Sequence, residues 1–244
     1  ESLCFPAIDA DGNALWPERW PVESFERAQR NAHVWAALYQ GQPRARGDQV
    51  FDGCHTYAVL PRIFQAAYGV DLSYSAKTRS DWSVALRLLR ATHADGEPIW
   101  YVARVVRKQE RAPVFRRRCN ALHESEPGAP WRWYAYGPEI GVADLFDAED
   151  GVPIEAIAAK GDKLMRASPV AEAWNAGRVL LPQSAPWLED FLAEVAGFTG
   201  VGDAHDDQVD ALAAAFDLLA EAHDDAMPED PGPPQRGALG ALSL

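Results

Sequence analysis

Runs of apolar residues with two different spacings predict a series of strands and helices. Short runs rich in β-branched and aromatic residues, bounded by turn residues, predict strands at 67–73, 82–91, 99–106, 131–136, 154–158 and 178–181. Apolar residues at helical spacing predict helices at 21–39, 112–123, 141–149, 162–176, 187–196 and 205–223. Three strands come first and helices then alternate with strands. We therefore expect an α/β fold with a mixed sheet covered by helices on its faces.

Turn and capping signals support several of these boundaries. Asp95-Gly96 lies between two of the expected strands and predicts a hairpin turn. Pro113 falls in the first turn of the helix at 112–123, where proline is tolerated. Gly177 directly follows the helix at 162–176, as a C-terminal glycine cap does.

Composition divides the chain into three parts. Residues 1–50 are rich in Trp, Pro and Arg, and we expect an N-terminal arm or linker from a preceding domain. Residues 51–223 contain almost all of the expected sheet and helices, and 224–244 are Pro-, Gly- and Ala-rich, which predicts a disordered tail. The chain begins with Glu1 rather than Met, so we expect a piece of a longer polypeptide.

The overall composition excludes several classes of protein. Hydrophobic residues make up 48% of the chain and charged residues 24%, as in an ordinary globular protein. The three cysteines are far apart and form no CxxC pair, which argues against a zinc ribbon or a disulfide framework. No apolar run approaches the ~20 residues of a membrane span, so we expect no membrane partner.

Charge is distributed unevenly along the chain. The net charge of −13 argues against a uniformly basic nucleic-acid-binding domain. Residues 104–118 nevertheless contain seven basic residues and one acid, whereas 201–225 contain eight acids and neither Lys nor Arg. The basic stretch is suited to phosphates, and the acidic stretch is suited to cations.

Acidic residues at three distant places are candidate metal ligands. Asp71 ends an apolar strand, where a carboxylate either caps the next turn or binds a metal. Asp207 and Asp210 are three residues apart and Asp206 and Asp210 are four apart, so these side chains share a helix face. Their mutual repulsion favours a bound cation or a basic partner, although acids at a helix start also act as caps. Glu139 follows a strand, and taken alone it is more simply a turn residue.

Two cations begin the expected helix at 162–176. Lys163 and Arg166 stand at the end of the helix that the helix dipole disfavours for positive charge, which indicates either an anionic partner or a solvated face that pairs with Asp162. Carboxylate ligands suit Mg²⁺ or Mn²⁺. Two such ions can activate water and stabilise the leaving oxygen in phosphodiester cleavage.

Several segments, in their order, resemble the nuclease domain of tailed-bacteriophage terminase large subunits, the DNA-packaging motors. The order of the segments, rather than any one motif, carries the resemblance, which covers about residues 30–220. The segments are 35–43 with Gly47 and Phe51, 69–72, 80–83, 161–163, Arg166-Ala167, 174–177, 187–198 and His205-Asp206-Asp207-Gln208-Val209-Asp210-Ala211.

The resemblance implies a ribonuclease H-like fold and a two-metal-ion endonuclease that cuts concatemeric double-stranded DNA. Asp71 matches the catalytic Asp of the first strand, and Asp207 and Asp210 match the metal-binding pair of the last helix. Glu139 is the candidate for the middle acidic ligand. Further acids and a histidine are possible accessory residues: Asp81, Asp144 (also the second candidate for the middle ligand), His205 and Asp206.

The same resemblance implies partners and a location. Two Mg²⁺ or Mn²⁺ ions would be the cofactors, and double-stranded DNA, the portal, the small terminase subunit and the motor ATPase domain of the same polypeptide would be the partners. We expect the host cell cytoplasm as the location. The segment GxxxxGK(S/T) of the motor is not in this sequence, so ATP hydrolysis is not assigned to it. The expected DNA contacts are Arg104, Arg107, Lys108, Arg116, Arg117, Lys163 and Arg166.

Other functions stay open from the residues alone. A resolvase or transposase of the same fold would differ in substrate. A non-catalytic DNA-binding or motor-docking module would use the acids only as helix caps. A carbohydrate enzyme would use two carboxylates without metal.

Overall fold

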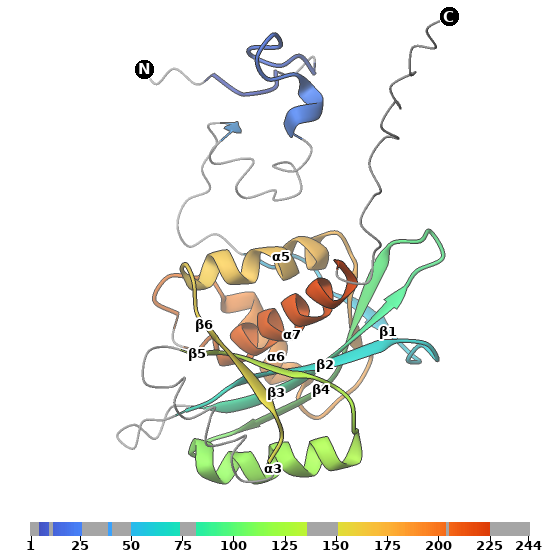
Figure 1. Ribbon diagram of the computed structural model, residues 1–244, viewed down its shortest axis with the longest axis vertical. Helices are drawn as coiled ribbons and strands as arrows, with labels where there is room; N and C mark the ends of the chain where they lie inside the picture. The colour runs from blue at the N-terminus through green and yellow to red at the C-terminus, as the bar shows by residue number, and fades with distance from the viewer. Residues whose placement is uncertain are drawn as a thin grey trace, which may run out of the picture.

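The centre of the molecule is a mixed β-sheet (Figure 1). The computed structural model describes residues 5–9, 12–25, 39–40, 50–73, 82–135, 151–203 and 205–224. In these residues the sheet has seven strands in the order β1-β7-β4-β3-β2-β5-β6. The strands are β1 (His55–Tyr57), β2 (Gln65–Asp71), β3 (Ser83–Thr92), β4 (Pro98–Lys108), β5 (Trp131–Ala135), β6 (Ile154–Ala158) and β7 (Val179–Pro182). Strand β3 is antiparallel to β2 and β4, and the other neighbouring strands are parallel.

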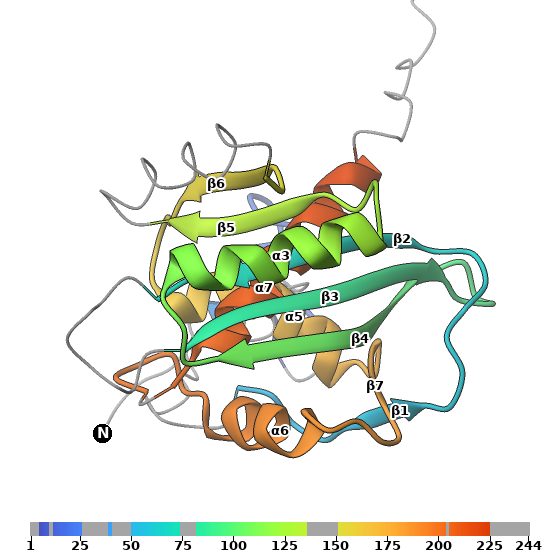
Figure 2. The ribbon, with the colours of Figure 1, turned by 90° about the horizontal axis from the view of Figure 1, so that it is seen from below.

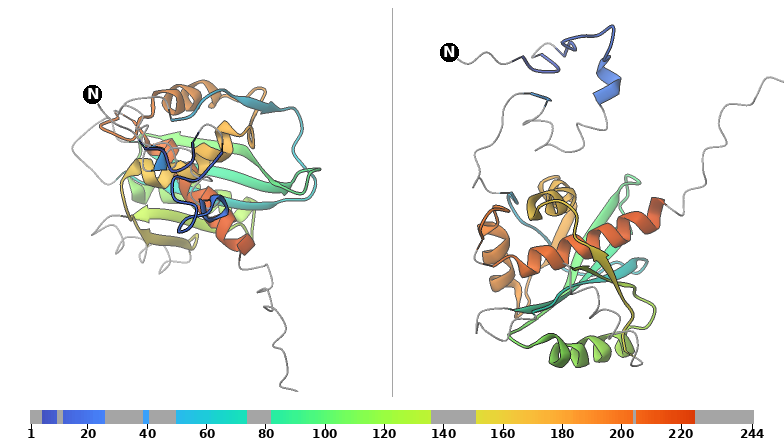
Figure 3. Two further views of the ribbon diagram at one scale, coloured as in Figure 1. Left: turned by 90° about the horizontal axis from the view of Figure 1, so that it is seen from above. Right: turned by 60° about the vertical axis from the view of Figure 1, so that its left-hand side comes forward.

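Helices cover both faces of this sheet. Helix α3 (Ala112–Ser125) lies on one face, whereas α5 (Lys163–Asn175), α6 (Leu188–Gly197) and α7 (Asp207–Asp224) lie on the other (Figures 1 and 2). Figure 3 shows α7 crossing the sheet, where it contacts β2, β3 and β5. A short 3-10 helix, η1 (Val22–Phe25), belongs to the N-terminal part of the chain.

Alternation along β2 decides which face of the sheet each side chain joins. Ala67 belongs to the core formed with α5, α6 and α7, whereas Tyr68 and Val70 belong to the core formed with α3. Successive strand side chains point to opposite faces. Asp71, four residues after Ala67, therefore lies on the face that α7 covers.

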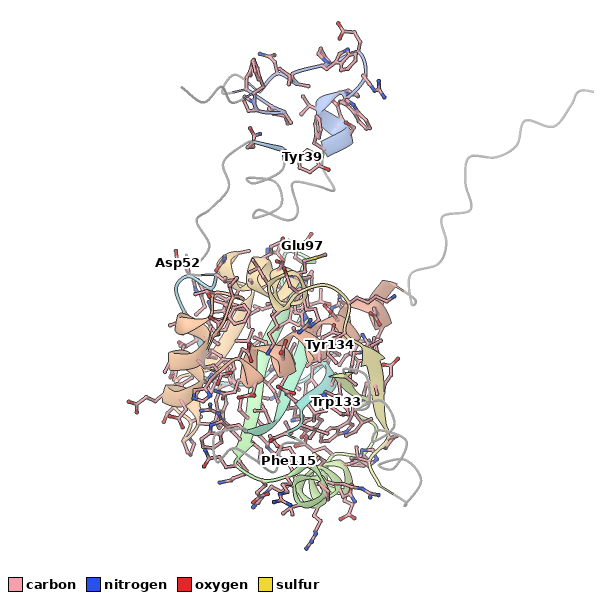
Figure 4. All side chains as sticks on the ribbon, turned by 90° about the vertical axis from the view of Figure 1, so that its left-hand side faces the viewer. Tyr39, Asp52, Glu97, Phe115, Trp133 and Tyr134 are labelled. Carbon is pink, nitrogen blue, oxygen red and sulfur yellow. The ribbon has the colours of Figure 1, made fainter. Side chains whose placement is uncertain are left out.

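Strand β5 follows the same rule. Trp133 and Phe115 belong to the core on the α3 side, and Tyr134 packs against the core on the α7 side (Figure 4). The Tyr134 hydroxyl donates a hydrogen bond to Asp217 of α7. The α7 side of the sheet therefore contains polar contacts as well as an apolar core.

Gly69 allows α7 to lie directly on β2. A Cβ atom at this position would stand 1.8 Å from the Ala211 carbonyl oxygen and 2.7 Å from the Ala215 backbone nitrogen. Both distances are far below any van der Waals contact, so the backbone of the helix touches the strand at a residue without a side chain. This contact brings the start of α7 towards the end of β2.

Most of the elements expected from the sequence pattern are confirmed, as is the mixed α/β fold class. The hairpin turn at Asp95-Gly96 and the start of α3 at Ala112, with Pro113 in its first turn, stand where expected. Strand β1 was not expected. The helix expected at 21–39 is described only in part, and its described part contains η1. Residues 26–38 and the helix expected at 141–149 lie outside the described residues. The domain boundaries at 50 and 224 stay predictions.

No helix in the described ranges has the length and hydropathy that crossing a membrane requires.

Candidate functional site

Carboxylates from two elements meet where β2 ends and α7 begins. Asp71 is the last residue of β2, Asp206 directly precedes α7, and Asp207 and Asp210 lie in its first turn. Burial raises the pKa of Asp71 well above its ordinary value, and the negative charges of Asp210, Asp207 and Asp206 raise it further. The fold therefore brings four acids predicted from the sequence into one electrostatic cluster.

Two cations of α5 pair with these carboxylates. The Lys163 Nζ atom lies 2.5 Å from Asp206 Oδ1 and 3.2 Å from Asp210 Oδ2. The Arg166 guanidinium donates to Asp210 Oδ1 at 3.0 Å and lies over the Tyr134 ring. Burial alone would lower the pKa of Lys163, but the charges of Asp210 and Asp206 raise it above its ordinary value.

The local sequence explains why α5 presents these cations. Asp162 caps the helix, because its side chain accepts a hydrogen bond from the Met165 backbone nitrogen at 2.8 Å. Gly161 before it has a φ of +72°, which favours glycine. Asp162 is thus used as a cap, and Lys163 pairs with Asp206 and Asp210.

The start of α7 is held from α6 by a buried acid, Glu194. Its carboxylate accepts hydrogen bonds from the Gln208 backbone nitrogen at 2.6 Å and from Gln208 Nε2 at 2.7 Å. It also pairs with Arg107 of β4 at 3.2 Å, and the Arg107 guanidinium lies 4.2 Å from the centre of the Trp82 ring. The sequence pattern does not single out Glu194, because its partners are distant and an acid in an amphipathic helix is ordinary.

Glu194 also affects the electrostatics of the carboxylates. Burial raises the pKa of Asp207 to about 6, with further contributions from the charges of Glu194 and Asp206. The cations Arg107 and Lys163 act in the opposite direction. The negative charges of α6 and of its own segment therefore both disfavour the ionised form of Asp207.

The chemistry of these residues fits a divalent cation. The pKa values of Asp71 and Asp207 are raised because their negative charge is buried and incompletely compensated, and a cation would relieve this. Oxygen ligands of this kind suit Mg²⁺ and Mn²⁺. Among the described residues, no three His, Cys, Asp or Glu side chains are arranged as a ready metal site. Asp206 and Asp210 instead share the ammonium group of Lys163.

The basic stretch 104–118 does not form a single surface. Arg104 pairs with Glu126, which follows α3, whereas Arg107 pairs with Glu194 of α6 on the other face of the sheet. Lys108, the last residue of β4, and Arg117, on α3, are exposed, and Arg116 is half-buried. The stretch therefore contains both structural ion pairs and exposed cations.

Arg166 is buried against Asp210 and Tyr134. In this structure its guanidinium therefore pairs with Asp210, and the expected contact of Arg166 with DNA stays a prediction.

Glu139, Asp144 and Asp81 lie outside the described residues, so the middle acidic ligand stays a prediction. His205 is exposed and lines a pocket of about 320 Å³ together with Arg107, Asp190 and Asp203. This pocket lies beside Glu194 and the start of α7.

The sheet order, its covering helices and the acids where β2 ends and α7 begins define a ribonuclease H-like domain. Residues 68–219 match the family model described as the terminase RNaseH-like domain, which is more than half of the chain. The chain belongs to this family. A search of curated proteins gave no match.

Solved structures of phage large terminases share the fold. The zinc-bound large terminase nuclease of thermophilic phage G20c is 19% identical, with a TM-score of 0.51 over 70% of this chain and 99% of that chain. The large terminase nuclease domain of Thermus phage P74-26 is 18% identical, with a TM-score of 0.51 over 71% and 94%. A large terminase of another thermophilic bacteriophage, in complex with ADP, is 17% identical, with a TM-score of 0.55 over 78% of this chain and 50% of that chain.

The raised pKa of Asp207 predicts a pH dependence of stability. The folded chain takes up this proton near pH 6, above the ordinary pKa of 3.8, so it is protonated before the unfolded chain as the pH falls. The contribution of Asp207 to the free energy of unfolding in EDTA is therefore expected to rise by about 1 kcal/mol from about pH 7.5 to about pH 5, allowing for solvent screening. Asp71 and Asp206, whose pKa values are also raised, act in the same direction.

Urea unfolding at the two pH values measures this effect. Asp207→Asn should reduce the pH dependence, because the variant has no carboxyl group at this position to titrate. A wild-type chain that is less stable at the lower of the two pH values than at the higher would contradict the prediction.

Proposed function

We propose that the chain is the nuclease domain of a phage large terminase and that it hydrolyses phosphodiester bonds of double-stranded DNA with divalent cations. The observation that carries this proposal is the meeting of Asp71 with Asp207 and Asp210 at one end of the sheet, beneath α7. Helix caps alone do not account for it, because Asp71 belongs to a strand and its charge is opposed by the acids of α7.

Asp71, Asp207 and Asp210 would hold the cations, and Glu139 would supply the middle ligand, with Asp144 as the second candidate. Two Mg²⁺ or Mn²⁺ ions, when bound, would neutralise the phosphate, activate a water molecule and stabilise the leaving oxygen. The protein's own contribution is to position the ligands. Arg166 holds Asp210, and Glu194 holds the first turn of α7 through Gln208.

The solved structures support the use of divalent cations. The large terminase nuclease of phage G20c has been solved with zinc, with cobalt and with magnesium bound. For the present chain, Mg²⁺ or Mn²⁺ as a pair of ions is the proposal, because both prefer oxygen ligands.

The whole packaging reaction is a wider proposal. The chain spans about half the length of the ADP-bound large terminase that it resembles. We propose that it acts in the host cell cytoplasm, with a motor ATPase domain, the portal and the small terminase subunit as partners. Its substrate would be concatemeric viral DNA.

Cleavage of supercoiled plasmid tests the proposed activity. We expect nicking and linearisation with Mg²⁺ or Mn²⁺ and none with EDTA. Equal amounts of branched and unbranched duplex should be cut at similar rates. A strong preference for branched DNA would favour a resolvase, and strand joining would favour a transposase. DNA binding without metal-dependent cutting would contradict the proposal and favour a docking module.

Cations at the same end of the sheet are the proposed DNA contacts, and Lys108 and Arg117 are the exposed ones among them. Lys108 pairs in register with Ser83, next to the Val84–Asp71 pair, and the Ala112 backbone nitrogen donates to the Ser73 carbonyl at 3.1 Å. The end of β4 and the start of α3 therefore lie beside the end of β2. Lys108, Arg116 and Arg117 belong to these two elements and are the first candidates, and Lys163 lies at the carboxylates themselves. Arg104 and Arg107, which pair with Glu126 and Glu194, are further candidates.

Lys108→Gln is expected to weaken binding of a short duplex in Ca²⁺ and EDTA alike. Each lost phosphate contact should reduce the slope of log K against log salt by about 1. Fluorescence anisotropy at several salt concentrations measures the slope. Arg62→Gln is the matched control, since Arg62 is exposed in the loop before β2, at the opposite end of that strand from Asp71. Equal slopes for wild type and Lys108→Gln would contradict this placement.

A further inference from the structure

The ammonium group of Lys163 occupies the place among the carboxylates where a cation is expected. It lies within hydrogen-bonding distance of Asp206 Oδ1 and Asp210 Oδ2, the latter an oxygen of a proposed metal ligand. Its charge also acts on Asp71 and Asp207, since it lowers the pKa of both. One side chain of α5 thus interacts with every acid of the cluster.

We propose that Lys163 is a built-in counter-ion that competes with the divalent cation for the carboxylates of α7. This inference rests on the proposed function, because the cation is the one that the nuclease would use. In the metal-free protein Lys163 stabilises the carboxylates, and binding of the cation displaces its ammonium group. Lys163 therefore sets how much divalent cation is needed to load the site.

The contacts of Asp210 show why displacement falls on Lys163. Both of its oxygens are engaged, Oδ1 by Arg166 and Oδ2 by Lys163. A cation bound by Asp210 has to share or replace one of these partners.

Arg166 and Lys163 differ in how firmly they are held. The Arg166 side chain is 5% exposed, stacks over the Tyr134 ring and also donates to the Gly161 carbonyl. The Lys163 side chain is 36% exposed and ends in a compact charge on a flexible stem. Lys163 can leave towards solvent, whereas Arg166 would have to leave a packed environment.

A merely structural role for Lys163 makes the opposite prediction for metal affinity. If Lys163 only supported the fold, its removal would loosen the carboxylates and weaken cation binding. If it competes with the cation, its removal leaves the negative charge uncompensated and strengthens cation binding. The direction of the change separates the two roles.

Calorimetric titration of the full chain with Mn²⁺ alone, without DNA, tests the proposal. Lys163→Gln and Lys163→Met are expected to bind Mn²⁺ about tenfold more tightly than wild type, because a like charge has been removed from the site. Lys163→Arg keeps the charge and should bind no more tightly than wild type. Lys160→Gln removes an exposed lysine three residues away and should leave the affinity unchanged.

Thermal unfolding gives a second measurement that does not depend on activity. In EDTA the two neutral variants should unfold at lower temperature than wild type, and Mn²⁺ should raise their Tm by more than it raises that of wild type. Equal or weaker Mn²⁺ affinity in both neutral variants would overturn the role of Lys163 while leaving the proposed nuclease intact. Absence of Mn²⁺ binding in all variants would overturn both proposals.

Discussion

Asp71→Asn is expected to reduce metal-dependent plasmid cleavage by at least about 10³-fold. Changes to groups that only orient metal ligands already cost about 10–100-fold, and this variant removes a proposed ligand itself. Asp71 belongs to a strand of the sheet, whereas Asp207 and Asp210 belong to α7. The acids of α7 therefore cannot bind the cation from the position that Asp71 occupies. Cleavage rates with Mg²⁺ and with Mn²⁺, measured for wild type and variant, give the ratio.

The same variant is expected to be more stable than wild type in EDTA at neutral pH. The pKa of Asp71 is raised, so its ionised form is disfavoured in the folded chain relative to the unfolded chain. The loss of stability is complete at pH values above the raised pKa of Asp71, and it disappears as the pH falls below the ordinary pKa of an aspartate. Asparagine has no charge and avoids the cost, so Tm should rise as activity is lost.

Asp95→Asn is the matched control for this pair of results. Asp95 lies in the turn between β3 and β4, at the end of the hairpin opposite to Asp71, and pairs with Arg178. Hydrogen bonds from Arg178 and the Glu97 backbone lower the pKa of Asp95, so its charge is favoured in the fold. The control should keep full cleavage and gain no stability. An Asp71→Asn variant that retains a tenth or more of wild-type cleavage would contradict the assignment.

Gly69→Ala is expected to lower the free energy of unfolding by at least about 3 kcal/mol, at the upper end of the usual cost of overpacking. The added methyl group would meet backbone atoms of Ala211 and Ala215, which cannot move without the whole of α7. Because α7 carries Asp207 and Asp210, the shift should also weaken cation binding. Urea unfolding and Mn²⁺ titration measure the two effects.

Gly197→Ala is the matched control. A Cβ atom at Gly197, the last residue of α6, meets nothing within 4 Å. Alanine there is expected to be neutral or to stabilise the chain by up to about 1 kcal/mol. A Gly69→Ala variant as stable as wild type would contradict the direct contact of α7 with β2.

The pattern of apolar residues predicts elements that are long or strongly bounded. The β3–β4 hairpin and helices α3 and α5 carry their own signals in Asp95-Gly96, Pro113 and Gly177, and all three stand where expected. Strand β1 has three residues at the edge of the sheet, which is too short for an alternating pattern to be visible. Its place depends on pairing with β7, a contact between distant parts of the chain.

The candidate site likewise has one part that local sequence signals predict and another that depends on contacts between distant parts of the chain. Acids at a strand end and on one helix face make Asp71, Asp207 and Asp210 candidates for either caps or metal ligands, and the resemblance to the terminase nucleases favours ligands. The pairing of Lys163 and Arg166 with α7, and the support from Glu194, depend on how α5 and α6 pack around the start of α7. The sequence shows which residues are charged but not which residues they pair with. A cation that the sequence predicts to contact phosphate can therefore be paired with a carboxylate inside the fold.

A crystal structure of the full chain soaked in Mn²⁺, with the anomalous signal of the metal, tests the central claim most directly. The account predicts Mn²⁺ bound by Asp71 together with Asp207 or Asp210, with Lys163 moved away from Asp210. Mn²⁺ found only elsewhere on the protein, with Lys163 still bonded to Asp206 and Asp210, would contradict it.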